Sequence, residues 1–115
     1  MYGVDRKGEV RCVELESGKH VWSSTAATKA DRRDSPSMFL VKHEDRFFLA
    51  NDLGELIIAK LSPEGYEEIS RAQMIDPQTM TNQRKVVWSH PAFANRCVFA
   101  RNDQRIVCIS LAESE

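Results

Sequence analysis

Short apolar runs alternate with polar turns along the whole chain. Valine, isoleucine, leucine and phenylalanine gather in runs of about four to eight residues, and glycines, Asn-Asp pairs or charged residues separate the runs. This pattern is typical of β-strands joined by tight turns. It predicts an all-β fold.

The middle of the chain, 37–75, predicts one complete unit. Three short turns join four expected strands, which lie at 37–42, 46–50, 55–61 and 66–74. Four consecutive antiparallel strands of this length form the repeating unit, or blade, of a β-propeller.

The two ends of the chain predict incomplete units, at 1–23 and 86–111. Each contains three expected strands, which lie at 1–4, 9–14 and 19–23 in the first unit and at 92–94, 96–101 and 105–111 in the last. The first unit lacks the innermost strand of a blade and the last lacks the outermost. The polar stretches 24–36 and 76–84 predict connecting loops, because both lack strand alternation and contain proline.

A short sequence motif occurs twice in the chain, and a truncated copy occurs a third time. Aligned on its small residue, Ala59 follows Cys12 by 47 residues and Cys108 follows Ala59 by 49. Both spacings fall within the roughly 40–50 residues of propeller blades. Because repeat units bury their apolar faces only against neighbours, 1–115 is predicted to be a single partial β-propeller of four-stranded antiparallel blades.

The incomplete units leave strand edges open at both ends. Unpaired edges expose backbone N–H and C=O groups that favour pairing. We therefore expect these edges to pair with the remaining blades of a longer parent protein or with a second copy of the chain, including by exchange of strands.

The three cysteines occupy informative positions. Cys12 and Cys108 share a repeat position with Ala59, which predicts a small and tightly packed site. If Asn102-Asp103 formed a two-residue turn, Cys97 would lie opposite Cys108, and the sequence leaves open whether the two are bonded. Three distant cysteines do not have the spacing of a zinc site.

Charge and hydropathy exclude several classes of function. The chain has 16 basic and 17 acidic residues and a formal charge of −1, which gives no electrostatic basis for binding nucleic acid or an anionic membrane. No apolar run approaches the ~18 residues of a membrane-spanning helix. The first residues lack the pattern of a signal peptide, and the compartment stays open because a longer parent could carry an export signal.

The first copy of the sequence motif matches a family pattern. It reads Cys12-x-Glu14-x-x-Ser17-Gly18-Lys19-x-x-Trp22 and resembles the repeat of the quinoprotein-type (PQQ-like) β-propellers, Ala-x-Asp-x-x-Thr-Gly-Lys-x-x-Trp. The second copy keeps Ala59 and Gly65 and aligns Ile69 with Trp22. In such a repeat Gly18 supplies a positive φ, and Trp22 packs against the neighbouring blade and needs a partner for its indole N–H.

The resemblance implies alternatives for function. Enzymes of this family hold the quinone at the hub near carboxylates and calcium, but those residues are not part of the repeat and none is assigned here. The first hypothesis is a non-catalytic scaffold or binding surface for a protein or a small ligand, with no cofactor identified. The alternative is the C-terminal part of a PQQ-dependent oxidoreductase whose active-site residues lie outside this chain, and a third reading is an independent small β-sandwich. Family members of this kind imply a periplasmic or exported location.

Candidate reactive residues are few, and each has a structural interpretation. His90, in Trp88-Ser89-His90-Pro91, is interpreted as a loop histidine rather than a ligand, because adjacent Ser and His side chains do not form a nucleophile–base pair. The trio His43-Glu44-Asp45 and the pairs Asn51-Asp52 and Asn102-Asp103 are interpreted as turn residues. No catalytic, cofactor-binding or metal-binding residue is predicted.

Overall fold

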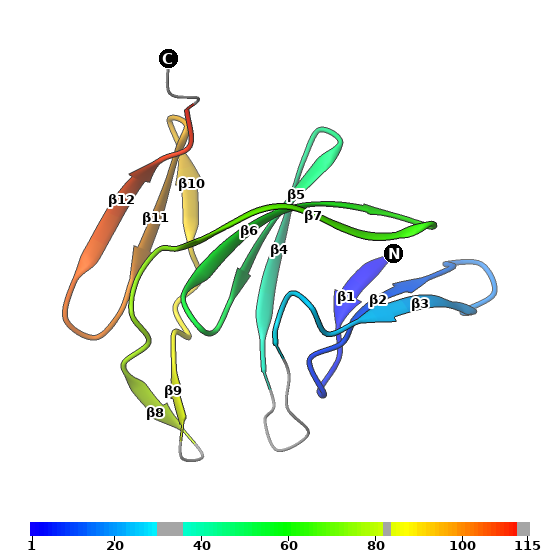
Figure 1. Cartoon of the computed structure of the whole chain (residues 1–115), viewed down its shortest axis with the longest axis horizontal. Coiled ribbons are helices and arrows are strands. Elements are labelled where there is room, and N and C mark those ends of the chain that lie inside the picture. The colour runs from blue at the N-terminus through cyan, green and yellow to red at the C-terminus, as the bar shows by residue number, and fades with distance from the viewer. Residues whose placement is uncertain (30–35, 82–83, 113–115) are drawn as a thin grey trace.

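The computed structural model describes residues 1–29, 36–81 and 84–112, and within them the chain forms twelve strands and no helix (Figure 1). The prediction of an all-β fold is confirmed. All strand pairs are antiparallel, and they form four separate sheets. The molecule is flat, with extents of 44 × 41 × 20 Å.

The central sheet contains four strands in chain order, which are β4 (Met38–His43), β5 (Arg46–Asn51), β6 (Glu55–Ser62) and β7 (Gly65–Gln73). Each strand begins and ends within one residue of its predicted bounds. The agreement follows from strong local signals, since the apolar runs are rich in Phe, Leu and Ile and the turns contain Asp, Asn and Gly.

Two three-stranded sheets flank the central sheet in the described part of the chain. The N-terminal sheet contains β1 (Tyr2–Val4), β2 (Val10–Val13) and β3 (His20–Ser24). The C-terminal sheet contains β10 (Ala92–Ala94), β11 (Cys97–Arg101) and β12 (Ile106–Ser110). Figure 1 shows the N-terminal sheet and the C-terminal sheet on opposite sides of the central one.

One predicted connecting loop contains a small hairpin. Strands β8 (Thr79–Thr81) and β9 (Arg84–Val86) pair within and beside 76–84, which the sequence predicts to be a connecting loop. Thr79 lies opposite Val86, so β-branched residues support the extended backbone although the stretch lacks an apolar alternation. The hydroxyl of Thr79 also donates to the carboxylate of Asp103, at 3.0 Å from Oδ2.

The two faces of the central sheet pack against different neighbours. On β5, Phe47 meets Tyr2 of the N-terminal sheet edge to face at 5.4 Å, whereas the adjacent Phe48 stacks on Phe93 of the C-terminal sheet at 5.1 Å. Successive strand residues point to opposite faces, so one strand serves both contacts. We name the contact with the N-terminal sheet the first junction and the contact with the C-terminal sheet the second junction.

Candidate functional site

In each of the three larger sheets one hairpin turns at an Asp or Asn. These hairpins are β1–β2, β5–β6 and β11–β12. The turn residues are Asp5, Asn51 and Asn102, and the side-chain oxygen of each accepts two backbone N–H groups from the following residues at 2.8–3.1 Å. Short polar side chains stabilise turns in this way. The interpretation of Asn51 and Asn102 as turn residues is therefore confirmed.

The two asparagines also join their sheets to the preceding segment. The amide nitrogen of Asn51 donates to the carbonyl oxygen of Ala27 at 2.9 Å, and that of Asn102 donates to the carbonyl oxygen of Asp76 at 3.0 Å. Asp5 carries no amide donor. Asn51 and Asn102 thus link consecutive sheets, and their partners lie 24 and 26 residues away in sequence.

The turns give a structural alignment of the three sheets. The residue three positions before each turn residue faces a residue of the next strand, in the pairs Tyr2 with Cys12, Phe48 with Ile58 and Phe99 with Cys108. Cys12 therefore corresponds to Ile58 and not to Ala59, so the alignment made from the sequence is one residue out of register in the central sheet. Ala59 faces the N-terminal sheet instead, where it is fully buried.

A difference in hairpin length explains the error at the tryptophan position. Trp22 lies opposite Cys12, and the residue in the corresponding place opposite Ile58 is Ser70. Ile69, which the sequence aligns with Trp22, is the extra residue of a bulge and is 41% exposed. The N-terminal sheet has a bulge at the same place, so the error comes from the β6–β7 hairpin, which is two residues longer than the β2–β3 hairpin.

Trp22 makes the predicted contact with the neighbouring sheet. Its indole N–H donates to the carbonyl oxygen of Ser62 in β6 at 2.6 Å, and its ring packs against the buried residues of the first junction. Tyr2 lies beside it with ring centroids 6.2 Å apart. Gly18, in the turn before Trp22, has the predicted positive φ of 71°.

The cysteines depart from two predictions. Cys12 is buried at 4% exposure, but Cys108 is exposed, so the expected tight packing is wrong for the third copy. Cys97 lies opposite Ser110 rather than Cys108, because the β11–β12 turn spans four residues, 102–105, instead of two. All three cysteines are free, and a hydrogen bond with the thiol of Cys97 raises the pKa of Cys108.

An ionic cluster crosses the first junction. The buried carboxylate of Glu55 bonds to Arg71 at 3.1 Å and to Lys29 at 3.3 Å. Arg71 also contacts Glu68 at 2.6 Å and donates to the carbonyl oxygen of Ala26 at 2.7 Å. The cluster thereby connects β6 and β7 to the segment that leaves the N-terminal sheet.

The cluster controls the ionisation of its members. Burial favours the neutral form of Glu55, but hydrogen bonds from Asn51 and Lys29 and the charge of Arg71 outweigh burial and lower its pKa. The hydrogen bond from Arg71 lowers the pKa of Glu68. Burial and the bond to Glu68 raise the pKa of Tyr66 far above its ordinary value. These shifts favour fixed charges in a structural cluster rather than a group that exchanges protons near neutral pH.

A second buried carboxylate holds the end of the central sheet. Asp52 accepts the backbone N–H of Ser37 at 2.9 Å and forms an ion pair with Arg84 of β9 at 2.7 Å. Its backbone oxygen accepts the N–H of Val87 at 2.7 Å. Asp52 therefore joins the start of β4 to the β8–β9 hairpin.

The remaining candidate residues lie apart from one another. His90 is exposed and its ring packs at a tilt against Phe39, with centroids 4.1 Å apart, and its Nδ1 lies 2.8 Å from the carbonyl oxygen of Pro91. His43 packs near Phe48 at the end of β4, and Glu44 adopts a positive φ of 56° in the following turn. This geometry agrees with turn and packing roles.

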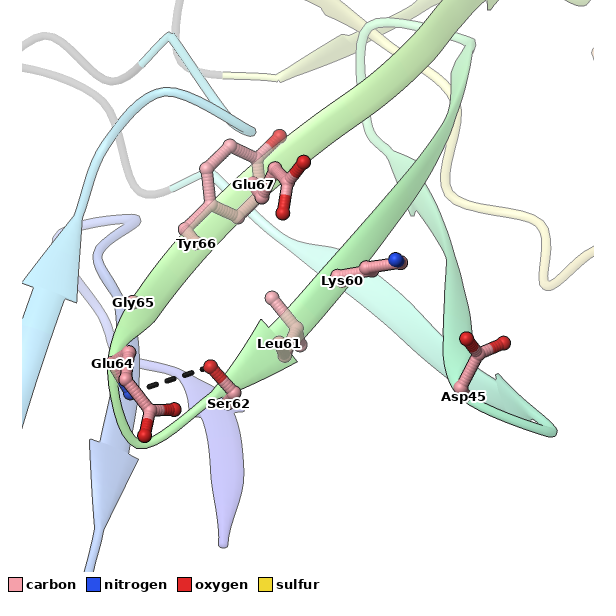
Figure 2. Close-up of a pocket in the computed structure, with 8 residues that line it drawn as sticks. All are labelled: Asp45, Lys60, Leu61, Ser62, Glu64, Gly65, Tyr66 and Glu67. Carbon is pink, nitrogen blue, oxygen red and sulfur yellow. Dashed lines mark hydrogen bonds between the residues drawn. The ribbon is translucent and has the colours of Figure 1, made fainter.

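A hollow of about 320 Å³ lies beside the β6–β7 hairpin (Figure 2). Figure 2 shows Asp45 on the β4–β5 turn and the other lining residues on the hairpin, and these are Lys60, Leu61, Ser62, Glu64, Gly65, Tyr66 and Glu67. Three carboxylates, one ammonium group and a tyrosine ring give this surface both polar and apolar contacts. The carboxylates outnumber the ammonium group, so the surface carries a net negative charge.

No family model, curated protein sequence or solved structure matches the chain. Across 1–29, 36–81 and 84–112, no group of three or more His, Cys, Asp or Glu side chains could hold a metal ion. The same described ranges contain no helix with the length and hydrophobicity of a membrane span.

Proposed function

We propose that this chain is a non-catalytic repeat segment of a β-propeller, similar to the quinoprotein-type repeats, which serves as a scaffold and presents a binding surface to a protein or a small ligand. Trp22, Gly18 and the four-stranded unit 37–75 are the features that suggest the repeat class. The proposal assigns no cofactor and no catalytic residue.

The observation that carries the proposal is the repeated direction of stacking. Tyr2 and Phe48 occupy corresponding positions in two successive sheets, and each faces the next sheet along the chain. Adjacent propeller blades pack in this way, so that each unit covers one face of the next. The repeated stacking therefore supports a propeller over a sandwich of two facing layers.

The polar contacts support a scaffold rather than an enzyme. Trp22, Asn51 and Asn102 each donate a side-chain hydrogen bond to a backbone oxygen of a neighbouring segment. Such bonds fix the positions of the sheets. None of these three bonds orients a nucleophile or a general base.

The hollow beside the β6–β7 hairpin is the surface that we propose for binding. The three carboxylates of Asp45, Glu64 and Glu67, against the one ammonium group of Lys60, favour a ligand or peptide with positive charge.

A cofactor titration tests the non-catalytic proposal. Pyrroloquinoline quinone with calcium is added to the full-length parent of which the proposal makes this chain a segment, and the quinone absorbance and tryptophan fluorescence are followed; calcium alone is the control. We expect changes that remain linear in quinone concentration. Saturable uptake at a defined stoichiometry would contradict the proposal and favour the oxidoreductase alternative.

A further inference from the structure

The C-terminal sheet exposes the face that the other two sheets bury. Phe99 and Cys108 occupy the positions of Tyr2 and Cys12, which face the next sheet. Cys108 is exposed, and Ile106, two residues earlier on the same face of β12, is 71% exposed. Among the described residues, no sheet covers this face.

The N-terminal sheet leaves a hollow on its opposite, outward face. Gly3 pairs with Arg11 at the place where the central sheet pairs Leu49 with Ile57. Leu49 is fully buried in the first junction, whereas a Cβ on Gly3 would meet no atom within 4 Å. The hollow measures about 170 Å³, and its lining consists of Met1, Gly3, Val4, Asp5, Arg11 and Val13.

We propose that the exposed face of the C-terminal sheet stacks on the outward face of the N-terminal sheet of a second copy of this chain, so that copies associate head to tail. In both junctions an aromatic side chain of one sheet meets the next sheet, Tyr2 against Phe47 and Phe48 against Phe93. The third aromatic residue of the series, Phe99, would meet the hollow at Gly3. The contact between copies would continue the stacking already present within each copy.

The contact is heterologous, because it joins two different surfaces. Such contacts produce closed rings or open chains of copies according to the rotation between neighbours. The inference rests on the repeated stacking used in the proposed function. The cofactor titration does not test that stacking, so the two can fail separately.

Sedimentation velocity of the full chain over a range of concentrations tests the proposal. We expect concentration-dependent association, and we expect Ile106→Glu to reduce the association constant by about tenfold or more, because it places a charge in an apolar contact. Leu15→Glu is the matched control, since Leu15 is 75% exposed in the β2–β3 turn, away from both faces. Thermal melting establishes that each variant folds, and Ile106→Ser replaces Ile106→Glu if the charge prevents folding.

A cross-link identifies the surfaces. A thiol introduced by Gly3→Cys, in a Cys97→Ser background, is oxidised with glutathione disulfide, which takes up the two electrons and two protons and leaves as two glutathione molecules. We expect a disulfide between position 3 of one copy and Cys108 of another. A chain that stays monomeric, equal association of the Ile106→Glu and Leu15→Glu variants, or cross-links only between two Cys108 residues would overturn the proposal. Association that survives Ile106→Glu would instead indicate pairing of the open strand edges.

Discussion

The first and second junctions differ in how they are sealed, although the same central sheet forms one side of each. The first encloses seven buried apolar residues, which are Val10, Ala27, Met38, Leu49, Ile57, Ala59 and Leu61. The buried cluster beside the second contains Ile75, Val87 and Ala100, and its aromatic contacts involve half-buried rings. Since burial of apolar area is the main source of stability, we expect the second junction to open before the first.

One position accounts for much of the difference. Trp22 of β3 and Ser70 of β7 correspond in the two sheets, and each side chain lies where it could reach the next sheet. Trp22 covers the first junction and bonds to the carbonyl oxygen of Ser62, whereas Ser70 is exposed. The tryptophan side chain buries a large apolar surface and also donates a hydrogen bond to the next sheet. The hydroxymethyl group of serine does not cover the junction in this way.

The largest expected effect is at Leu49, in the middle of the first junction. Leu49→Ala should lower the free energy of unfolding by about 2–5 kcal/mol, because the fully buried side chain leaves a cavity. Urea denaturation measures the loss. Leu15→Ala is the matched control and should change stability by about 0.5 kcal/mol or less, as Leu15 is 75% exposed. Equal losses in the two variants would show that the first junction is not the main core.

The next largest difference in stability between the two junctions is expected from the hydrogen bonds of Asn51 and Asn102. Asn51→Asp keeps the turn, as Asp5 does in the N-terminal sheet, but removes the donor to Ala27 and places a charge beside Glu55. We expect a loss of about 1–3 kcal/mol in the free energy of unfolding. The matched variant Asn102→Asp should lose less, because the residue in the position of Glu55 is Arg105, whose cation attracts the new carboxylate.

Hydrogen exchange of the two variants locates the effects. Asn51→Asp should raise exchange at the first junction, and Asn102→Asp should raise it in the C-terminal sheet. A larger loss of stability in Asn102→Asp than in Asn51→Asp would reverse the comparison of the junctions.

The contribution of Trp22 is expected to be smaller than these. Trp22→Phe removes the indole donor to Ser62 and part of the ring, which should lower the free energy of unfolding by about 1–2 kcal/mol. Trp88→Phe is the control, because Trp88 is 58% exposed. Chemical denaturation of both variants tests this, and a Trp88→Phe effect as large as that of Trp22→Phe would contradict it.

The sequence predicted most of the strands but not their exact correspondence. The central sheet was predictable because its runs are apolar and its turns carry Asn, Asp and Gly. The β8–β9 hairpin was missed because Thr79 and its neighbours are polar, and their pairing depends on contacts such as the one with Asp103. Ile69 is misaligned with Trp22 because the β6–β7 hairpin is two residues longer than the β2–β3 hairpin, and a comparison of spacings assumes equal lengths.

Several contacts of the candidate site could not be predicted from the sequence, because they join residues far apart in the chain. A partner for the indole of Trp22 was expected, but the carbonyl oxygen of Ser62 lies 40 residues away and no local pattern identifies it. The cluster of Glu55 and Arg71 joins residues 16 positions apart on adjacent strands, which only the strand register brings together. The turn position of Asn51 was predicted from local chemistry, whereas its bond to Ala27 depends on the first junction.

The smallest effect, and the one most specific to the first junction, is its dependence on pH. The pKa of Glu55 in the folded state lies below its ordinary value of 4.5, so the folded protein holds the ionised form more tightly than the unfolded chain does. The stabilisation is fully present above the unfolded-state pKa and is lost as the pH falls through the lower folded-state pKa. We therefore expect the free energy of unfolding to decrease as the pH falls below about 4.5, and Glu55→Gln should reduce this decrease because the variant has no carboxyl group to protonate. Urea denaturation at pH 6 and pH 3 measures it, with Glu67→Gln as the matched exposed control on β7. If Glu55→Gln kept the full decrease, protonation elsewhere would account for the acid sensitivity, and the cluster would not distinguish the first junction from the second.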